Sequence, residues 1–110
     1  MSRVICLISL LIAFNAFGKT YVIPSTQAGC DEILEVTTQG QLSHYERALK
    51  VKFVGDKKDK LFRLQNISQY YDSVWLDYKS NDGEELHYFW DDGYGISEGF
   101  RFRGCIYEIF

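Results

Sequence analysis

The sequence contains little cysteine, proline or histidine, and it has no block of basic charge. Among its 110 residues are three cysteines, one proline and two histidines, and 12 Lys and Arg residues face 15 Asp and Glu residues. The one run of adjacent cations is the Lys57-Lys58 pair. A nucleic-acid partner needs a basic face, so this composition disfavours nucleic-acid binding. The sequence also lacks internal repeats, low-complexity tracts and linkers, so we predict one small domain.

Long apolar runs are absent except for one near the start of the chain, Val4 to Phe14. Arg3 precedes this run and the small residues around Ala16 to Gly18 follow it, which is typical of a secretory signal. The run is too short to span a bilayer, so no membrane span is expected. We predict that residues 1–18 are a signal peptide and that residues 19–110 form a periplasmic or secreted domain.

The leader would take one cysteine, Cys6, away with it. Cys30 and Cys105 then remain, one near each end of the domain, in an oxidising compartment that favours a disulfide between them. Such a bridge closes a loop of about 75 residues and stabilises the fold by roughly 4 kcal/mol in the chain-entropy model. Loss of Arg3 changes the formal net charge from −3 to −4, and an acidic secreted protein is suited to a basic partner.

Alternating apolar and polar residues indicate an all-β fold. Leu49, Val51 and Phe53 alternate with two lysines, as in an antiparallel strand with one buried face. Other stretches of strand composition, bounded by turn residues, lie at 33–38, 61–64, 74–78, 86–90, 100–103 and 106–110. Residues 19–29 read as a mobile arm or an edge strand, and residues 42–48 as a short helix or a loop. Short strands at this spacing favour a sandwich or a small barrel.

The residues that could carry chemistry form no recognisable catalytic or metal site. Ser43 and His44 are neighbours in sequence without an orienting carboxylate, and His87 lies within an aromatic strand. Carboxylates cluster around two turns, at Asp82, Glu84, Glu85, Asp91 and Asp92, but their spacing matches no calcium loop, so we interpret them as solvated hairpin ends. We assign no catalytic residue, cofactor or metal. Asn66-Ile67-Ser68 is a formal glycosylation sequon.

Aromatic residues supply the alternative to catalysis. The densest run, Tyr88 to Trp90, suits a pleated strand and ends in the turn residues Asp91 to Gly93. If Leu76 and Tyr78 point inward, Trp75 points to the other face. Because Trp and Tyr carry much of the energy of protein interfaces, we hypothesise a protein-binding face here. The alternative is that these rings fill a small barrel.

Several short features resemble the C-type lysozyme inhibitor family of small secreted bacterial proteins. A cysteine followed by acidic residues opens a strand at Cys30 to Val36, and a leucine-containing strand at Leu61 to Leu64 precedes a Ser-to-Tyr segment, Ser73 to Tyr78. An aromatic strand ends in Phe-Trp-x-x-Gly at Phe89 to Gly93, and Cys105 closes the chain. The resemblance implies an eight-stranded antiparallel barrel, a disulfide between the two cysteines, and inhibition by occlusion of a lysozyme cleft.

The sequence departs from that family at its contact residues. The family carries a Ser-Gly-x-x-Tyr motif and a lysine before the turn glycine, and this lysine meets the catalytic carboxylates of lysozyme. Here Val74 follows Ser73, the spacing to Tyr78 is one residue longer, and Asp92 stands at the lysine position. An aspartate would repel those carboxylates.

We therefore expect a small antiparallel β-barrel of about eight strands that binds a protein, such as a basic lysozyme-like enzyme, and catalyses no reaction. The family's mode of inhibition would be altered or lost. The expected binding residues are Ser73, Trp75, Tyr78, Trp90, Asp91, Asp92 and Gly93. Two alternatives stay open, a periplasmic immunity protein against a delivered toxin and a secreted adhesion-type β-sandwich module. The oligomeric state and the glycosylation of Asn66 are not determined by the sequence.

Overall fold

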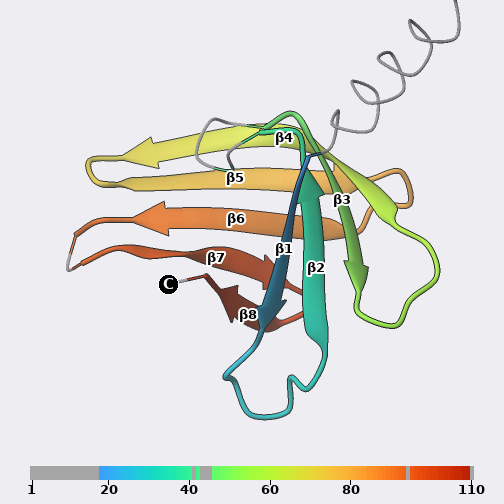
Figure 1. Cartoon of the computed structure of the whole chain (residues 1–110). Coiled ribbons are helices and arrows are strands. Elements are labelled where there is room, and N and C mark those ends of the chain that lie inside the picture. Colours follow the sequence, from blue (N-terminus) through green and yellow to red (C-terminus); the bar gives the residue numbers. More distant parts are fainter. Residues whose placement is uncertain (1–17, 41, 43–45, 94, 110) are drawn as a thin grey trace, which may run out of the picture.

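A computed structural model describes residues 18–40, 42, 46–93 and 95–109. They form eight strands: β1 (Lys19–Pro24), β2 (Ile33–Thr38), β3 (Ala48–Phe53), β4 (Lys60–Tyr70), β5 (Ser73–Ser80), β6 (Glu85–Asp91), β7 (Ser97–Phe102) and β8 (Cys105–Glu108). All eight belong to one antiparallel sheet in the order of the sequence. The sheet curls into a nearly closed barrel in which β1 to β3 cross steeply over β4 to β7 (Figure 1).

This topology confirms the predicted small β-barrel. The sandwich alternative is wrong, because a sandwich needs two sheets and every described strand joins the same one. The alternation in β3 works as predicted, since Leu49, Val51 and Phe53 are buried and the two lysines between them face outward. The inward-facing apolar side chains form a single core: Ile23, Leu34, Val36, Leu42, Leu49, Val51, Phe53, Phe62, Leu76, Tyr78, Leu86, Tyr88, Phe100, Phe102 and Tyr107.

Strand β4 extends well past the predicted end at Leu64. A register shift between Leu64 and Asn66 inserts an extra residue opposite β5, and pairing then continues to Tyr70. The β4–β5 and β6–β7 hairpins therefore project beyond the strands that cross them, toward the left of Figure 1. Of the two interpretations of residues 19–29, the edge strand is confirmed over 19–24. Residues 42–48 are described only in part.

The two edges of the sheet are fastened by side chains. No backbone ladder joins β1 to β8 among the described residues, since these strands stand at the ends of the sheet order. The predicted disulfide Cys30–Cys105 is confirmed, with Cα atoms 6.0 Å apart. Nearby, the Ser25 hydroxyl donates to the Ile106 carbonyl at 2.7 Å, and the Ile106 N–H donates to the Gln27 side-chain oxygen at 2.9 Å. These links hold the barrel almost shut.

Candidate functional site

Four of the predicted binding residues meet at one end of the barrel. Ser73 begins β5 and pairs with Asp91 at the end of β6, and Asp92 and Gly93 follow directly. We call residues 70–73, 91–93 and 95–97 the tip. It lies where the two projecting hairpins turn (Figure 1).

The other three predicted residues lie elsewhere. Trp75 is on the outer face of β5, where it pairs with Phe89. Trp90 is half-buried and packs against the core from the inner face. Tyr78 is only 1% exposed, and its hydroxyl donates to the Glu46 carbonyl. Burial raises the pKa of Tyr78. A side chain in this position cannot contact a partner, so we leave Tyr78 out of the candidate surface.

A backbone hydrogen bond joins the two turns of the tip. The Asp92 N–H donates to the Asp72 carbonyl at 3.0 Å. The Asp91 carboxylate accepts from the Gly93 N–H at 2.8 Å and so stabilises the second turn locally. Two loops that are about twenty residues apart in the chain thus form one surface, which is more ordered for binding than two separate loops would be.

The most exposed ring of the tip has an unfavourable backbone conformation. Tyr71 has φ of 40° and is fully exposed, with a relative accessibility of 104%. It is the first residue of a two-residue hairpin loop, a position with positive φ at which glycine is usual. A non-glycine residue in this region costs about 1 kcal/mol. Such outliers cluster at functional sites, where another role offsets the cost.

The tip carries further exposed apolar and acidic side chains. Tyr70 is 67% exposed and Ile96 59% exposed. The exposed carboxylates of Asp72, Asp91 and Asp92 lie on the same turns and form no ion pair with any described residue. The tip therefore combines exposed rings with unneutralised negative charge, which suits a basic partner with apolar contact area.

The outer face of β5 to β8 carries a groove of about 260 Å³. We call it the outer groove; it is lined by Trp75, Phe89, Asp91, Ser97, Arg101, Ile106 and Glu108. The Trp75 and Phe89 rings have centroids 5.4 Å apart. The Arg101 guanidinium lies 5.9 Å from the centre of the Trp75 ring. Of these residues, the sequence predicted only Trp75 and Asp91 as binding residues. The groove forms only when β5 to β8 lie side by side, with β8 as its far wall.

The histidine of the aromatic strand contacts a carboxylate but no nucleophile. His87 Nδ1 lies 2.7 Å from Asp77 Oδ1, and the second Asp77 oxygen accepts from the Asn66 amide at 3.4 Å. No described serine, threonine or cysteine hydrogen-bonds to His87. This arrangement lacks the attacking group of a catalytic triad. His44 lies outside the described residues.

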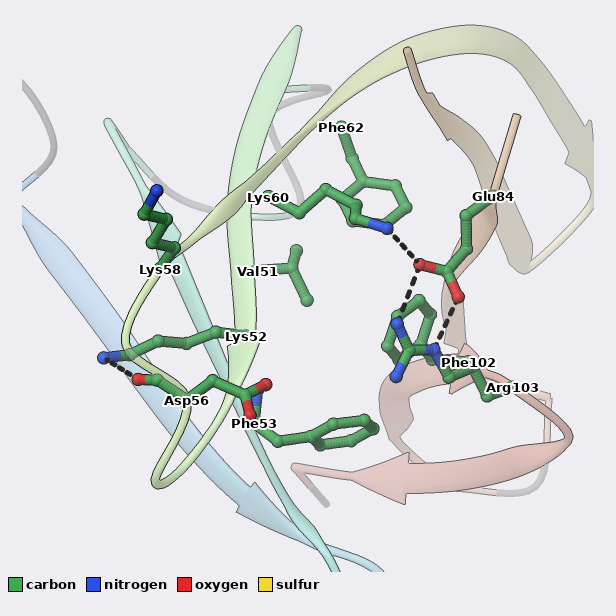
Figure 2. A pocket seen from close by; sticks show the side chains of 10 residues that line it. All are labelled: Val51, Lys52, Phe53, Asp56, Lys58, Lys60, Phe62, Glu84, Phe102 and Arg103. Carbon is green, nitrogen blue, oxygen red and sulfur yellow. Dashed lines mark hydrogen bonds and ion pairs between the residues drawn. The ribbon is translucent and has the colours of Figure 1, made fainter. Parts of the chain in front are cut away.

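The opposite end of the barrel closes with a charged cluster (Figure 2). Glu84 accepts from Lys60 Nζ at 3.0 Å and from Arg103 Nη2 at 3.0 Å. The Arg103 guanidinium stacks 4.8 Å and 5.2 Å from the ring centres of Phe102 and Phe53. A cavity of about 80 Å³ lies beneath this clamp. Glu84 pairs with both Lys60 and Arg103, so we interpret this cluster as a structural closure.

The carboxylates that cluster in the sequence lie at opposite ends of the β5–β6 hairpin. Asp82, Glu84 and Glu85 are at its turn, and Asp91 and Asp92 are at its open end. Asp82 bonds to Ser80 and Lys60, and these contacts lower its pKa to about 2. The Arg103 hydrogen bond, and then that of Lys60, lowers the pKa of Glu84. Within the described part of the chain, no three His, Cys, Asp or Glu side chains gather where they could hold a metal ion.

No protein-family model, curated protein or solved structure matches this chain. The likeness to C-type lysozyme inhibitors therefore stays a prediction from the sequence. The described residues contain no helix long and apolar enough to cross a membrane. The predicted signal peptide, residues 1–18, lies outside the described residues except for Gly18.

Proposed function

We propose that this chain is a secreted or periplasmic, non-enzymatic binding protein whose tip occludes a basic partner enzyme of the C-type lysozyme kind. The observation that carries the proposal is Tyr71, which is fully exposed and has φ of 40° at the end of the projecting hairpins. The ring itself contributes nothing that offsets the cost of this conformation, since no hydrogen bond or ring contact joins it to a described residue. A partner that buries the ring would offset it, since a buried tyrosine contributes strongly to interfaces.

The charge of the tip supports a basic partner. Asp72, Asp91 and Asp92 are exposed and form no ion pair with any described residue. Negative charge at the projecting end accelerates association with a basic enzyme and weakens binding as salt rises. The disulfide and the predicted leader are in keeping with an oxidising compartment.

Contact with the lysozyme cleft would differ from that of the inhibitor family. Asp92 stands where the family has a lysine, and an aspartate there would face the catalytic carboxylates unfavourably. We therefore place Tyr71 and the edge of the tip against the cleft, with the carboxylates directed toward the basic surface around it. Occlusion in this arrangement needs no ion pair with the catalytic groups.

The test is inhibition of a C-type lysozyme by the purified protein, beside the variants Tyr71→Ser and Asp92→Lys, over a range of salt concentrations. We expect inhibition that weakens with salt, about tenfold weaker inhibition for Tyr71→Ser, and stronger inhibition for Asp92→Lys. The control is Val54→Ser, which also removes an exposed apolar side chain (53% exposed) but outside the tip.

Other outcomes distinguish an error in the proposed partner from an error in the proposed binding surface. If only Asp92→Lys inhibits, the barrel and the tip orientation are supported and the natural partner is another basic protein, such as a delivered toxin. If wild type inhibits and Tyr71→Ser inhibits equally well, a different surface makes the contact. If neither protein inhibits, the lysozyme assignment is wrong.

A further inference from the structure

The outer groove presents a cation with no charged partner. Arg101 is exposed on β7 and forms no ion pair with any described residue. Arg103, two residues on, is fully engaged with Glu84. In an acidic protein, a free guanidinium held 5.9 Å from the Trp75 ring centre is a ready receptor for an anion.

The groove around Arg101 also contains aromatic rings and carboxylate acceptors. Trp75 and Phe89 form a half-buried aromatic surface, with Ile106 opposite on β8. Asp91 and Glu108 lie at the rim. Aromatic rings stack on flat apolar faces, guanidinium groups bind carboxylates in a bidentate manner, and carboxylates accept hydrogen bonds from hydroxyl groups.

One ligand class satisfies all three kinds of group. A pyranose ring offers an apolar C–H face and several hydroxyls, and a hexuronic acid adds a carboxylate. A peptide strand fits less well, because β5, β6 and β7 are paired on both sides and have no free backbone edge to offer. We infer that the outer groove is a binding site for acidic sugars, with the sugar ring on Trp75 and Phe89 and its carboxylate on Arg101.

A second depression extends the site. It has a volume of about 320 Å³ and is lined by Glu84, Glu85, His87, Arg103 and Gly104, and it shares Arg101 with the outer groove. Arg101 thus lies between two adjoining spaces along the same face. This arrangement favours an oligosaccharide of two or three rings over a single sugar.

The test is titration of the purified protein with tri-galacturonic acid, followed by tryptophan fluorescence, in parallel with its methyl ester. The ester keeps every ring and hydroxyl but removes the charge. We expect the acid to bind at least about tenfold more tightly than the ester. Arg101→Gln should lose this preference, and Trp75→Leu should weaken binding of both sugars.

Arg63→Gln is the matched control, since Arg63 is an exposed arginine on β4 outside the groove. It should bind like wild type. Equal affinity for acid and ester, retention of binding by Arg101→Gln, or no binding of the acid at millimolar concentration would overturn the inference. So would equally tight binding of a tri-glutamate peptide, because the groove would then recognise a carboxylate alone. The groove shares Asp91 and Ser97 with the tip, but Tyr71 does not line it, so Tyr71→Ser should not change sugar binding.

Discussion

Gly99 allows β8 to lie close beside its antiparallel partner β7 at the edge of the sheet. A Cβ at this position would lie 2.2 Å from the Tyr107 carbonyl oxygen and 2.9 Å from the Glu108 Cα. Both are backbone atoms, so relief requires movement of a whole strand. The Phe89 ring covers the same spot at 3.1 Å. The tight approach that glycine permits therefore also shapes the floor of the outer groove.

From this contact we expect Gly99→Ala to lower the free energy of unfolding by about 1–3 kcal/mol, the usual cost of overpacking. Urea denaturation followed by fluorescence measures it. Gly93→Ala is the control, because a Cβ there meets only the end of the Asp91 side chain, at 3.2 Å, and no backbone atom. A similar loss in both variants would contradict the clash as the cause, because the lower flexibility of the unfolded chain after Gly→Ala stabilises the fold and cannot produce a loss.

Two features of the sequence lead to different expectations for the position of the Tyr78 side chain. The alternation of Val74, Leu76 and Tyr78 predicts that all three face inward, and the structure confirms it for Tyr78, which is 1% exposed. The resemblance assigns the same tyrosine to a partner's cleft. The two expectations conflict, and burial favours the first. The alternation of apolar and polar residues depends directly on which side chains are buried. A role taken over from the family that the sequence resembles depends on neighbouring residues, and these differ in this chain.

At the scale of the element, the β5–β6 hairpin has a different chemistry at each end. Its turn carries Asp82 and Glu84, which bind Lys60 and Arg103. Its open end carries Asp91, which forms no ion pair with any described residue. Cations thus neutralise the carboxylates at the turn, where the barrel must close, and leave those at the tip available to a partner.

The ion pairs of Asp82 and Glu84 with Lys60 and Arg103 should make the free energy of unfolding depend on pH. The folded pKa values of Asp82 and Glu84 lie below their ordinary 3.8 and 4.5. A lowered carboxyl pKa stabilises the fold above the ordinary value, and that stabilisation is lost as the pH falls through the folded pKa. We expect unfolding free energy to fall between about pH 5 and pH 2.

Glu84→Gln tests this clamp. At neutral pH it should destabilise the fold by about 1 kcal/mol, a value limited by solvent screening of the half-exposed Arg103. The difference from wild type should shrink as the pH falls through the lowered pKa of the wild-type Glu84 carboxyl. Glu85→Gln is the control, since Glu85 is 63% exposed and its one ion-pair contact with a described residue is His87, at 4.0 Å. A constant difference across pH would contradict the assignment.

The sequence predicted the strands that have one buried face. It predicted poorly the strand segments that project past the barrel core. Residues 33–38 alternate or carry β-formers and were placed correctly. The second half of β4 was missed, because the bulge after Leu64 interrupts the two-residue period and Gln65 and Asn66 favour loops. The tip was half predictable. Counting outward from the turn at Asn81 to Gly83 places Ser73 opposite Asp91, but the contact of Asp92 with Asp72 depends on the twist of the whole sheet.

For the whole molecule, the seam between β1 and β8 is the part least supported by backbone pairing. The tip lies on strands that are paired on both sides, and the seam depends on the disulfide and on Ser25 and Gln27. Opening of the barrel should therefore begin at the seam and spare the central strands. Local stability differs in this way between regions of many small domains.

Reduction of Cys30–Cys105 should separate these two regions. The bridge spans 75 residues of sequence, and its loss should cost about 4 kcal/mol in the chain-entropy model. We expect amide hydrogen exchange in the reduced protein to accelerate first in β1 and β8, while β5 and β6 keep protection until global unfolding. Ser25→Ala, which removes one seam hydrogen bond but keeps the bridge, should accelerate the same strands more weakly. Uniform acceleration of all eight strands would mean that the barrel opens only as a unit, so that the tip could not remain folded while the seam is open.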